Sequence, residues 1–190
     1  MVFKAARELS TEASNISSIP TLLQILRFPT SPSDRPNASE WQSVEEKLGM
    51  QLPEDYKEFI THYGTGAIDG FLWVLNPFSR NKYLNFFDQG QVKIDALRGL
   101  CQEAIPYPLH PDPNGMLPWG VTDNADVLFW CCNGPPSHWW IVVNEDRGPR
   151  WREYKLSTSD FLARLTTRRL VVDIFPEDFP SESPEFIPAH

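Results

Sequence analysis

The chain has 190 residues, of which 25 are acidic and 17 basic, so its formal net charge is -8, and 41% of its residues are hydrophobic. That size and apolar content suit one domain with a substantial core, since single domains commonly have roughly 100 to 150 residues. The acidic balance excludes a dominant basic surface of the kind that binds nucleic acid, and no run approaches the roughly 20 apolar residues of a membrane-spanning helix.

Residues 1–37 are expected to form a helical extension followed by a proline-rich linker. Apolar residues from Leu22 to Leu26 predict a short helix that ends before Pro29, and the linker then runs to Pro36. The first 18 residues lack the roughly 7 consecutive apolar residues of a secretory signal. We therefore expect a cytoplasmic protein, and three cysteines, too few for a disulfide framework, favour the same compartment.

Two amphipathic helices are predicted next. The first carries Trp41, Val44 and Leu48 at positions i, i+3 and i+7 and ends at Gly49. The second starts at Pro53, a residue that suits the first position of a helix, and is closed by a glycine. Its expected buried face consists of Tyr56, Phe59, Ile60 and Tyr63.

The middle of the chain combines a strand, two helices and a loop. Gly70–Leu75 is a short apolar run, which is typical of a buried strand. Helical spacing over residues 81–104 predicts two helices divided at Gly90, because glycine weakens a helix interior. A proline-rich loop is expected from Pro106 to Pro118.

Three strand-like runs follow, and the short turns between them predict an antiparallel meander. These runs are Ala125–Trp130, His138–Val143 and Trp151–Leu156. Ser157 can then cap a last helix. This order of elements indicates an α+β single domain whose mostly antiparallel sheet packs against several α-helices. The aromatic residues expected to share its core are Trp41, Tyr56, Trp119 and Trp130.

Residues 173–190 form an acidic, proline-rich C-terminal tail with five acidic residues, four prolines and no Lys or Arg. Apolar residues such as Phe175 and Phe179 are more frequent in it than a free tail requires. Residues 147–169 hold seven basic and two acidic side chains. We therefore expect the tail to fold back over that basic segment.

Six short motifs follow one another in the middle of the chain. They are Trp41-x-x-Val44-Glu45, Leu48-Gly49-x-x-Leu52-Pro53-x-x-Tyr56, Tyr63-Gly64-x-Gly66, Leu117-Pro118-Trp119-Gly120, Thr122-Asp123-Asn124 with Asp126, and Phe129-Trp130. In this order they resemble the signature of the SUKH superfamily, Smi/Knr branch. Ala125 departs from that signature, which favours glycine in this turn. The resemblance implies a Smi/Knr-type domain over residues 38–172.

The resemblance also implies a function without catalysis, and we expect no cofactor or metal. In bacteria such domains act as immunity proteins that bind and neutralise a toxin, for example a nuclease or another polymorphic-toxin effector. The acidic charge of this chain favours a basic toxin. The alternative is a regulatory interaction module or scaffold that has no toxin partner. We expect a monomer or a weak homodimer.

An enzymatic or metal-binding role is the weaker interpretation. Cys131, Cys132 and His138 could suggest a thiol nucleophile or metal ligands, but they lie in or beside apolar runs and no second ligand pair completes a zinc spacing. Asp123 and Asp126 could suggest a cation loop, yet no glutamate stands at the calcium-loop spacing. We therefore predict that the cysteines pack in the core and that these carboxylates cap a turn.

The candidate partner-binding residues are one tryptophan and three loop carboxylates. Trp139 and Trp140 are neighbours in a predicted strand, so one of them should point away from the core. An exposed tryptophan is a suitable interface anchor, and we select Trp139 for that role. Asp69, Asp123 and Asp126 lie in loops beside predicted strands, where they could present charge to a basic partner or only cap their own turns.

Overall fold

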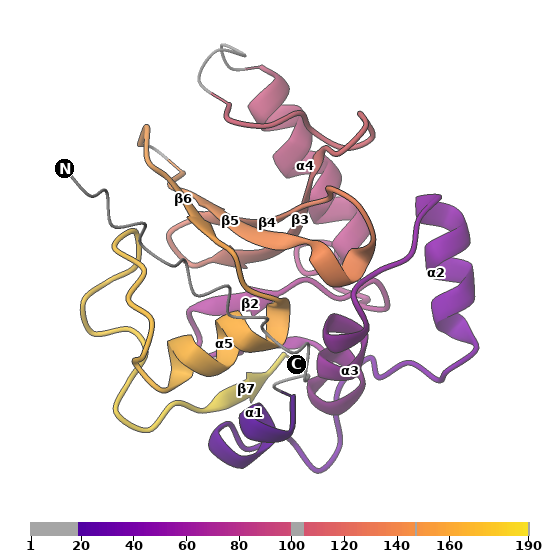
Figure 1. Cartoon of the computed structure of the whole chain (residues 1–190). Helices are drawn as coiled ribbons and strands as arrows, with labels where there is room; N and C mark the ends of the chain where they lie inside the picture. Colours follow the sequence, from indigo (N-terminus) through magenta and orange to yellow (C-terminus); the bar gives the residue numbers. More distant parts are fainter. Residues whose placement is uncertain (1–18, 100–104, 147, 190) are drawn as a thin grey trace, which may run out of the picture.

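The computed structural model describes residues 19–99, 105–146 and 148–189. These residues form the predicted α+β domain, built on one 7-stranded antiparallel sheet (Figure 1). In order across the sheet, the strands are β6 (Trp151–Tyr154), β5 (Trp140–Asn144), β4 (Val127–Cys131), β3 (Met116–Thr122), β2 (Leu72–Val74), β1 (Gly66–Ile68) and β7 (Phe186–Pro188). None of the described helices is both long enough and apolar enough to cross a membrane.

The helices cover the two faces of the sheet unequally (Figure 1). They are α1 (Ile19–Ile25), α2 (Glu40–Leu48), α3 (Glu54–Tyr63), α4 (Phe86–Arg98) and α5 (Thr158–Thr166). On one face α1, α3 and α5 pack against one another, with α2 beside α3, whereas α4 packs against β3 on the other face. Because α1 and α5 come from opposite ends of the described chain, this packing joins segments that are far apart in sequence.

Local sequence signals set where several helices begin and end. Gly49 ends α2 in the left-handed conformation, with φ 76°, and its N–H donates to the carbonyl of Glu45 at 2.9 Å. The side chain of Ser157 accepts the N–H of Asp160 at 3.3 Å, which caps α5 as predicted. Short polar side chains and glycine therefore act here in the positions that helix termini favour.

The predicted aromatic core is confirmed. Trp41, Tyr56, Trp119 and Trp130 belong to one buried cluster. The ring of Tyr56 meets that of Trp130 edge-on at 4.8 Å, and Trp119 stacks on Trp130 at 5.9 Å. Trp41 approaches Tyr56 at 6.0 Å, so the α2–α3 pair and the central strands share one core.

The expected division of residues 81–104 at Gly90 is wrong. A single helix, α4, runs from Phe86 to Arg98 through this glycine. The side chain of Asn85 caps its start by accepting the N–H groups of Phe87 and Asp88. Burial of apolar residues elsewhere on the helix offsets the roughly 1 kcal/mol that glycine costs relative to alanine in a helix interior.

Strands β1, β2 and β3 differ from the expectation. β3 starts at Met116, inside the expected proline-rich loop, and Pro118 lies within it where the pairing with β4 shifts register. A proline has no N–H to donate, and a bulge is a position in a sheet that tolerates this. The expected strand Gly70–Leu75 shortens to β2, and Gly66–Ile68 adds the unpredicted strand β1, whose three residues are too short for a periodic pattern.

The C-terminal segment packs against the rest of the chain. β7 pairs with β1, and the carboxylate of Asp173 accepts bonds from Arg152, the closest at 2.6 Å. Arg150 and Arg168 donate to the carbonyls of Asp173 and Pro180. The predicted return of the tail over the basic segment is therefore confirmed.

Candidate binding site

Asp69 holds the C-terminal segment in place. It lies in the β1–β2 turn with φ 51°, and its two carboxylate oxygens accept the N–H groups of Ser181 at 2.9 Å and Glu185 at 2.8 Å. The structure therefore gives this carboxylate an internal role. Its predicted contact with a partner remains a prediction.

Asp123 and Asp126 lie in the β3–β4 turn, at the same end of the sheet as Asp69. Asp123 is exposed and accepts the indole N–H of Trp73 at 2.9 Å. Asp126 is only 3% exposed and accepts the hydroxyl of Thr122 at 2.8 Å, so its expected presentation to a partner is wrong and the turn-capping interpretation describes it. The intervening alanine has φ 69°, the left-handed conformation in which the family favours glycine.

Trp139 is buried, so its expected exposure is wrong. It is 6% exposed, its indole N–H donates to the carbonyl of Gly134 at 3.0 Å, and its ring lies 5.9 Å from Trp130. The regular strand starts only at Trp140, which is half-buried beneath the ammonium group of Lys155 at 3.3 Å. Trp139 follows a short 3-10 turn instead, and strand alternation therefore does not govern its direction.

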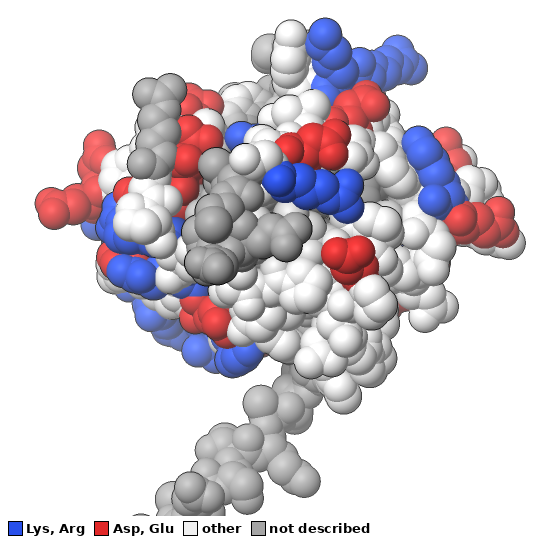
Figure 2. All heavy atoms as spheres, turned by 90° about the horizontal axis from the view of Figure 1, so that it is seen from above, with Lys and Arg blue, Asp and Glu red and all other residues white. Residues whose placement is uncertain are grey.

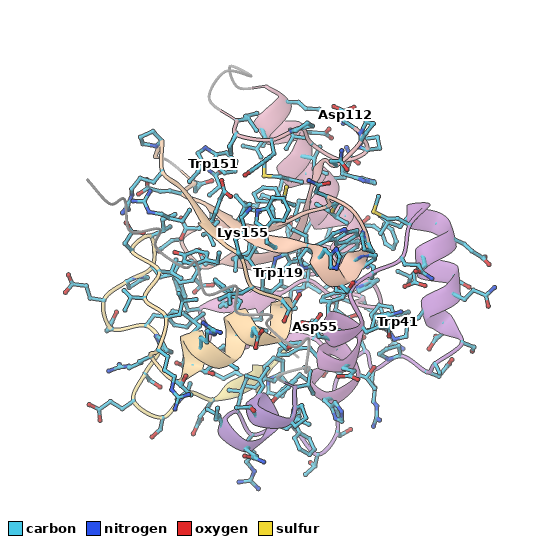
Figure 3. All side chains as sticks on the ribbon, viewed as in Figure 1. Trp41, Asp55, Asp112, Trp119, Trp151 and Lys155 are labelled. Carbon is cyan, nitrogen blue, oxygen red and sulfur yellow. The ribbon has the colours of Figure 1, made fainter. Side chains whose placement is uncertain are left out.

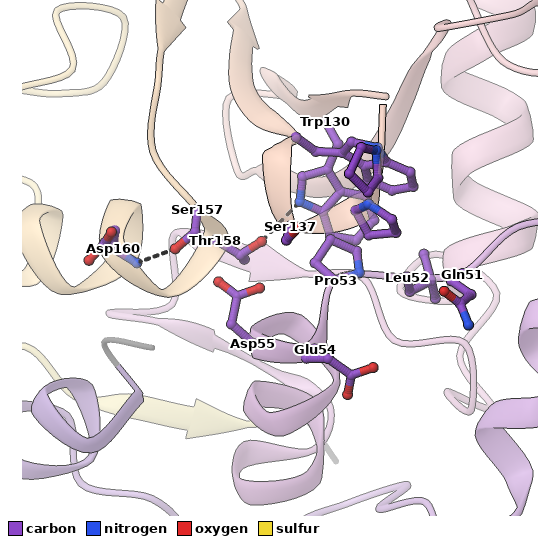
Figure 4. A pocket seen from close by; sticks show the side chains of 13 residues that line it. Gln51, Leu52, Pro53, Glu54, Asp55, Trp130, Ser137, Ser157, Thr158 and Asp160 are labelled. Atoms are coloured by element: carbon purple, nitrogen blue, oxygen red, sulfur yellow. Dashed lines mark hydrogen bonds between the residues drawn. The ribbon is translucent and has the colours of Figure 1, made fainter. Parts of the chain in front are cut away.

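Trp139 does line a pocket at the end of the sheet opposite to the three aspartates. The pocket has a volume of about 350 Å³ and lies where the starts of α3 and α5 meet the loop between β4 and β5 (Figure 4). Its lining residues come from three segments: Gln51, Leu52, Pro53, Glu54 and Asp55; Trp130, Pro135, Pro136, Ser137 and Trp139; and Ser157, Thr158 and Asp160.

Asp55 joins the two helix starts that form one wall of the pocket (Figure 3). One carboxylate oxygen accepts the N–H of Ser159 in α5 at 2.7 Å, and the other accepts the N–H of Tyr56 in α3 at 2.9 Å. Backbone N–H groups in the first turn of a helix have no partner within the helix. Asp55 supplies that partner for both helices at once and thereby fixes their relative position.

The opposite wall is fixed by tryptophan hydrogen bonds. The indole N–H of Trp130 donates to the hydroxyl of Thr158 at 2.9 Å, which ties β4 to α5 (Figure 4). The bond from Trp139 to Gly134 closes the β4–β5 loop on itself. Both walls are therefore pre-formed, and little ordering is required when a ligand enters.

The pocket has a negative electrostatic character. Glu54, Asp55 and Asp160 contribute carboxylates, and no Lys or Arg is among the described residues that line it. Each helix start adds roughly half a positive charge, which offsets only part of the three negative ones. Lys57, outside the lining, pairs with Glu54 at 2.7 Å and with Glu45 at 3.0 Å. By contrast, the face shown in Figure 2 intersperses acidic and basic side chains.

The cysteines are unsuited to act as nucleophiles at neutral pH. Burial raises the pKa of Cys131 to about 11, and burial also raises the pKa of Cys132. Both thiols therefore stay protonated, whereas a thiolate is the reactive form. In the parts of the chain that the structure describes, no three His, Cys, Asp or Glu side chains are grouped to hold a metal. Cys101 lies outside those parts.

Sequence reasoning missed the pocket because its walls meet only in the folded chain. The hydrogen bond from Ser159 to Asp55 joins residues 104 positions apart. The local signals were visible, since Pro53 opens one helix and Ser157 caps another. Nothing in either signal shows that the two helix starts face each other.

One comparison with known proteins finds a match. A model of the SUKH group, SUKH_6, with the description "SMI1-KNR4 cell-wall", matches residues 38–162. This match includes all three segments that line the pocket. No curated protein and no solved structure matches the chain.

Proposed function

Because the chain belongs to the SUKH family, we propose that it is a non-enzymatic immunity protein, which binds one toxin domain in the cytoplasm of the producing bacterium and blocks its activity. The observation that carries this proposal is the family match over residues 38–162. The pocket supports it, because the anchor side chains of protein interfaces commonly fill well-packed, desolvated pockets of this kind.

The charge of the chain favours a basic toxin. With a net charge of -8, the protein attracts a basic partner over several ångströms before contact. Such long-range attraction mainly accelerates association, while a few enclosed side chains supply most of the affinity. The pocket and its rim are the part of the described surface that we assign to those close contacts.

Co-expression tests this function. A toxin domain found by sequencing the genes beside this one is expressed in a bacterial host with and without the full chain, and growth is measured. We expect growth to be restored only with the chain, and the purified toxin and chain to co-elute as one complex. Continued growth arrest, despite abundant folded chain, would contradict the immunity proposal.

The description of the matched family favours a second candidate. It names the cell wall and no toxin, which suits a regulatory scaffold with a cellular partner. In that case the gene should have no toxin gene beside it, and its deletion should alter cell-wall growth without any toxin present. Deletion in a strain that lacks the neighbouring gene separates the two functions.

A further inference from the structure

We propose that the pocket between α3, α5 and the β4–β5 loop receives an arginine side chain of the partner. This inference rests on the proposed function only for the partner being a protein. The pocket itself, with its volume of about 350 Å³, is large enough for one long side chain. Three properties of the pocket favour arginine. They are its apolar wall, its carboxylates, and the backbone N–H groups at its two helix starts, which already have a hydrogen-bond acceptor.

The apolar wall suits the aliphatic part of an arginine. Pro53, Pro135 and Pro136 line the pocket together with the buried tryptophans Trp130 and Trp139. Arginine buries its methylene groups along such surfaces while its charged end stays near polar groups. A short acidic or polar side chain would leave this wall uncovered.

The carboxylates suit the guanidinium group. Each oxygen of Asp55 accepts one backbone N–H, and a carboxylate offers about four acceptor positions in total, so capacity for a further donor remains. Glu54 also lines the pocket, and 82% of its side chain is exposed. The ammonium group of Lys57, which pairs with Glu54 at 2.7 Å, also pairs with Glu45 at 3.0 Å, so Glu54 can turn to a guanidinium without leaving the lysine unpaired.

The helix starts would otherwise favour an anion, since unpaired N–H groups and the helix dipole attract negative charge. Here Asp55 already occupies that position for both helices. A second anion would meet the carboxylates of Asp55 and Glu54 in the same pocket. Between the two cationic side chains, arginine is favoured because its guanidinium is more weakly hydrated and binds carboxylates in a planar, bidentate manner.

A peptide titration tests the pocket without any toxin. The full chain, labelled with nitrogen-15, is titrated with N-acetyl-Gly-Arg-Gly-amide and with the same peptide carrying citrulline, the neutral analogue of arginine. We expect the arginine peptide to shift the indole N–H signals of Trp130 and Trp139 in a saturable manner, with at least tenfold weaker binding of citrulline. Trp151 is an internal control, because it packs on the other face of the sheet and does not line the pocket.

Matched variants assign the effect to the pocket. Glu54→Gln combined with Asp160→Asn removes two charges from the lining, and Asp178→Asn combined with Glu182→Gln removes two from exposed positions of the C-terminal segment. We expect at least tenfold weaker arginine binding in the first pair and no change in the second. If the first pair fails to fold, the arginine and citrulline titrations of the unaltered chain still decide.

Three results overturn the inference: no shift with arginine, equal binding of both peptides, or equal loss in both variant pairs. None of them involves the toxin. If growth is restored in the co-expression test but the titration fails, the arginine inference is rejected and the immunity function stands. If the titration succeeds but growth is not restored, the immunity function is rejected and the arginine inference stands.

Discussion

The two faces of the sheet differ in how completely they are enclosed. On the face covered by α1, α3 and α5, Trp119 is fully buried and Trp130 is 1% exposed. On the α4 face, Phe129 is also buried, yet Trp140 and Trp151 at its margin remain half-buried. Among the described helices, α1, α3 and α5, with α2 beside them, enclose the first face and α4 encloses the second, so a side chain beyond the reach of α4 keeps partial contact with solvent. The pocket forms at the edge of the face that α1, α3 and α5 cover, where the starts of α3 and α5 meet.

The largest expected difference between the faces concerns their tryptophans. Trp130→Ala should lower the free energy of unfolding by about 3 to 5 kcal/mol, because it leaves a large cavity in the crowded core and removes the bond to Thr158. Trp151→Ala, at the margin of the other face, should lower it by about 1 kcal/mol. Urea unfolding measures both values, and similar losses in the two variants would show that the faces are equally enclosed.

Two glycines test the difference between the faces at the level of single methyl groups. A Cβ on Gly66 would lie 2.4 Å from the carbonyl oxygen of Ile187 and 2.6 Å from the ring of Phe186, so Gly66→Ala should destabilise the protein by about 1 to 3 kcal/mol. A Cβ on Gly90 in α4 would meet nothing within 4 Å. Gly90→Ala should therefore stabilise the helix by about 0.5 to 1 kcal/mol. Thermal unfolding of both variants measures the two effects, and a shift of the same sign in both would contradict the difference in packing.

The link between α3 and α5 has a smaller expected effect. Asp55→Ala removes the acceptor of two first-turn N–H groups, those of Tyr56 and Ser159, and should cost about 1 to 2 kcal/mol of stability. Asp55→Asn keeps an amide oxygen that can accept one of these bonds and should recover part of the loss. Urea unfolding of the two variants tests this order. Equal stability of both variants and the unaltered chain would mean that Asp55 does not hold the helices together.

The sequence predicted features that neighbouring residues determine, and it failed where distant segments meet. Gly49 and Ser157 placed helix ends correctly, and apolar spacing identified the aromatic core. The pocket could not be predicted, because Asp55 and Ser159 become neighbours only through packing on the sheet. Trp139 was assigned the wrong exposure because alternation applies only within a regular strand, and the chain enters β5 one residue later.

The smallest expected effect concerns two adjacent thiols that belong to opposite faces. Cys131 packs in the hydrophobic cluster under α4, and Cys132 packs in the cluster under α1, α3 and α5. Burial raises the pKa of Cys131 from 9.0 to about 11 and also raises the pKa of Cys132. Stability from these neutral thiols is fully present below pH 9 and declines as the pH rises further, because the unfolded chain ionises first.

Unfolding in urea at pH 7.0 and pH 9.5 measures this decline, and buried tyrosines, whose pKa values burial also raises, add a loss that is common to all the variants. We expect the unaltered chain to lose about 1 kcal/mol for each thiol over that interval, since one pKa unit corresponds to about 1.4 kcal/mol. Cys131→Ala should abolish the part of this loss that Cys131 causes and leave the part that Cys132 causes. Cys132→Ala should do the converse. If only Cys132→Ala reduced the loss, the thiol on the α4 face would be ionising in the folded protein, and that face would be more open to water than the burial of Cys131 indicates.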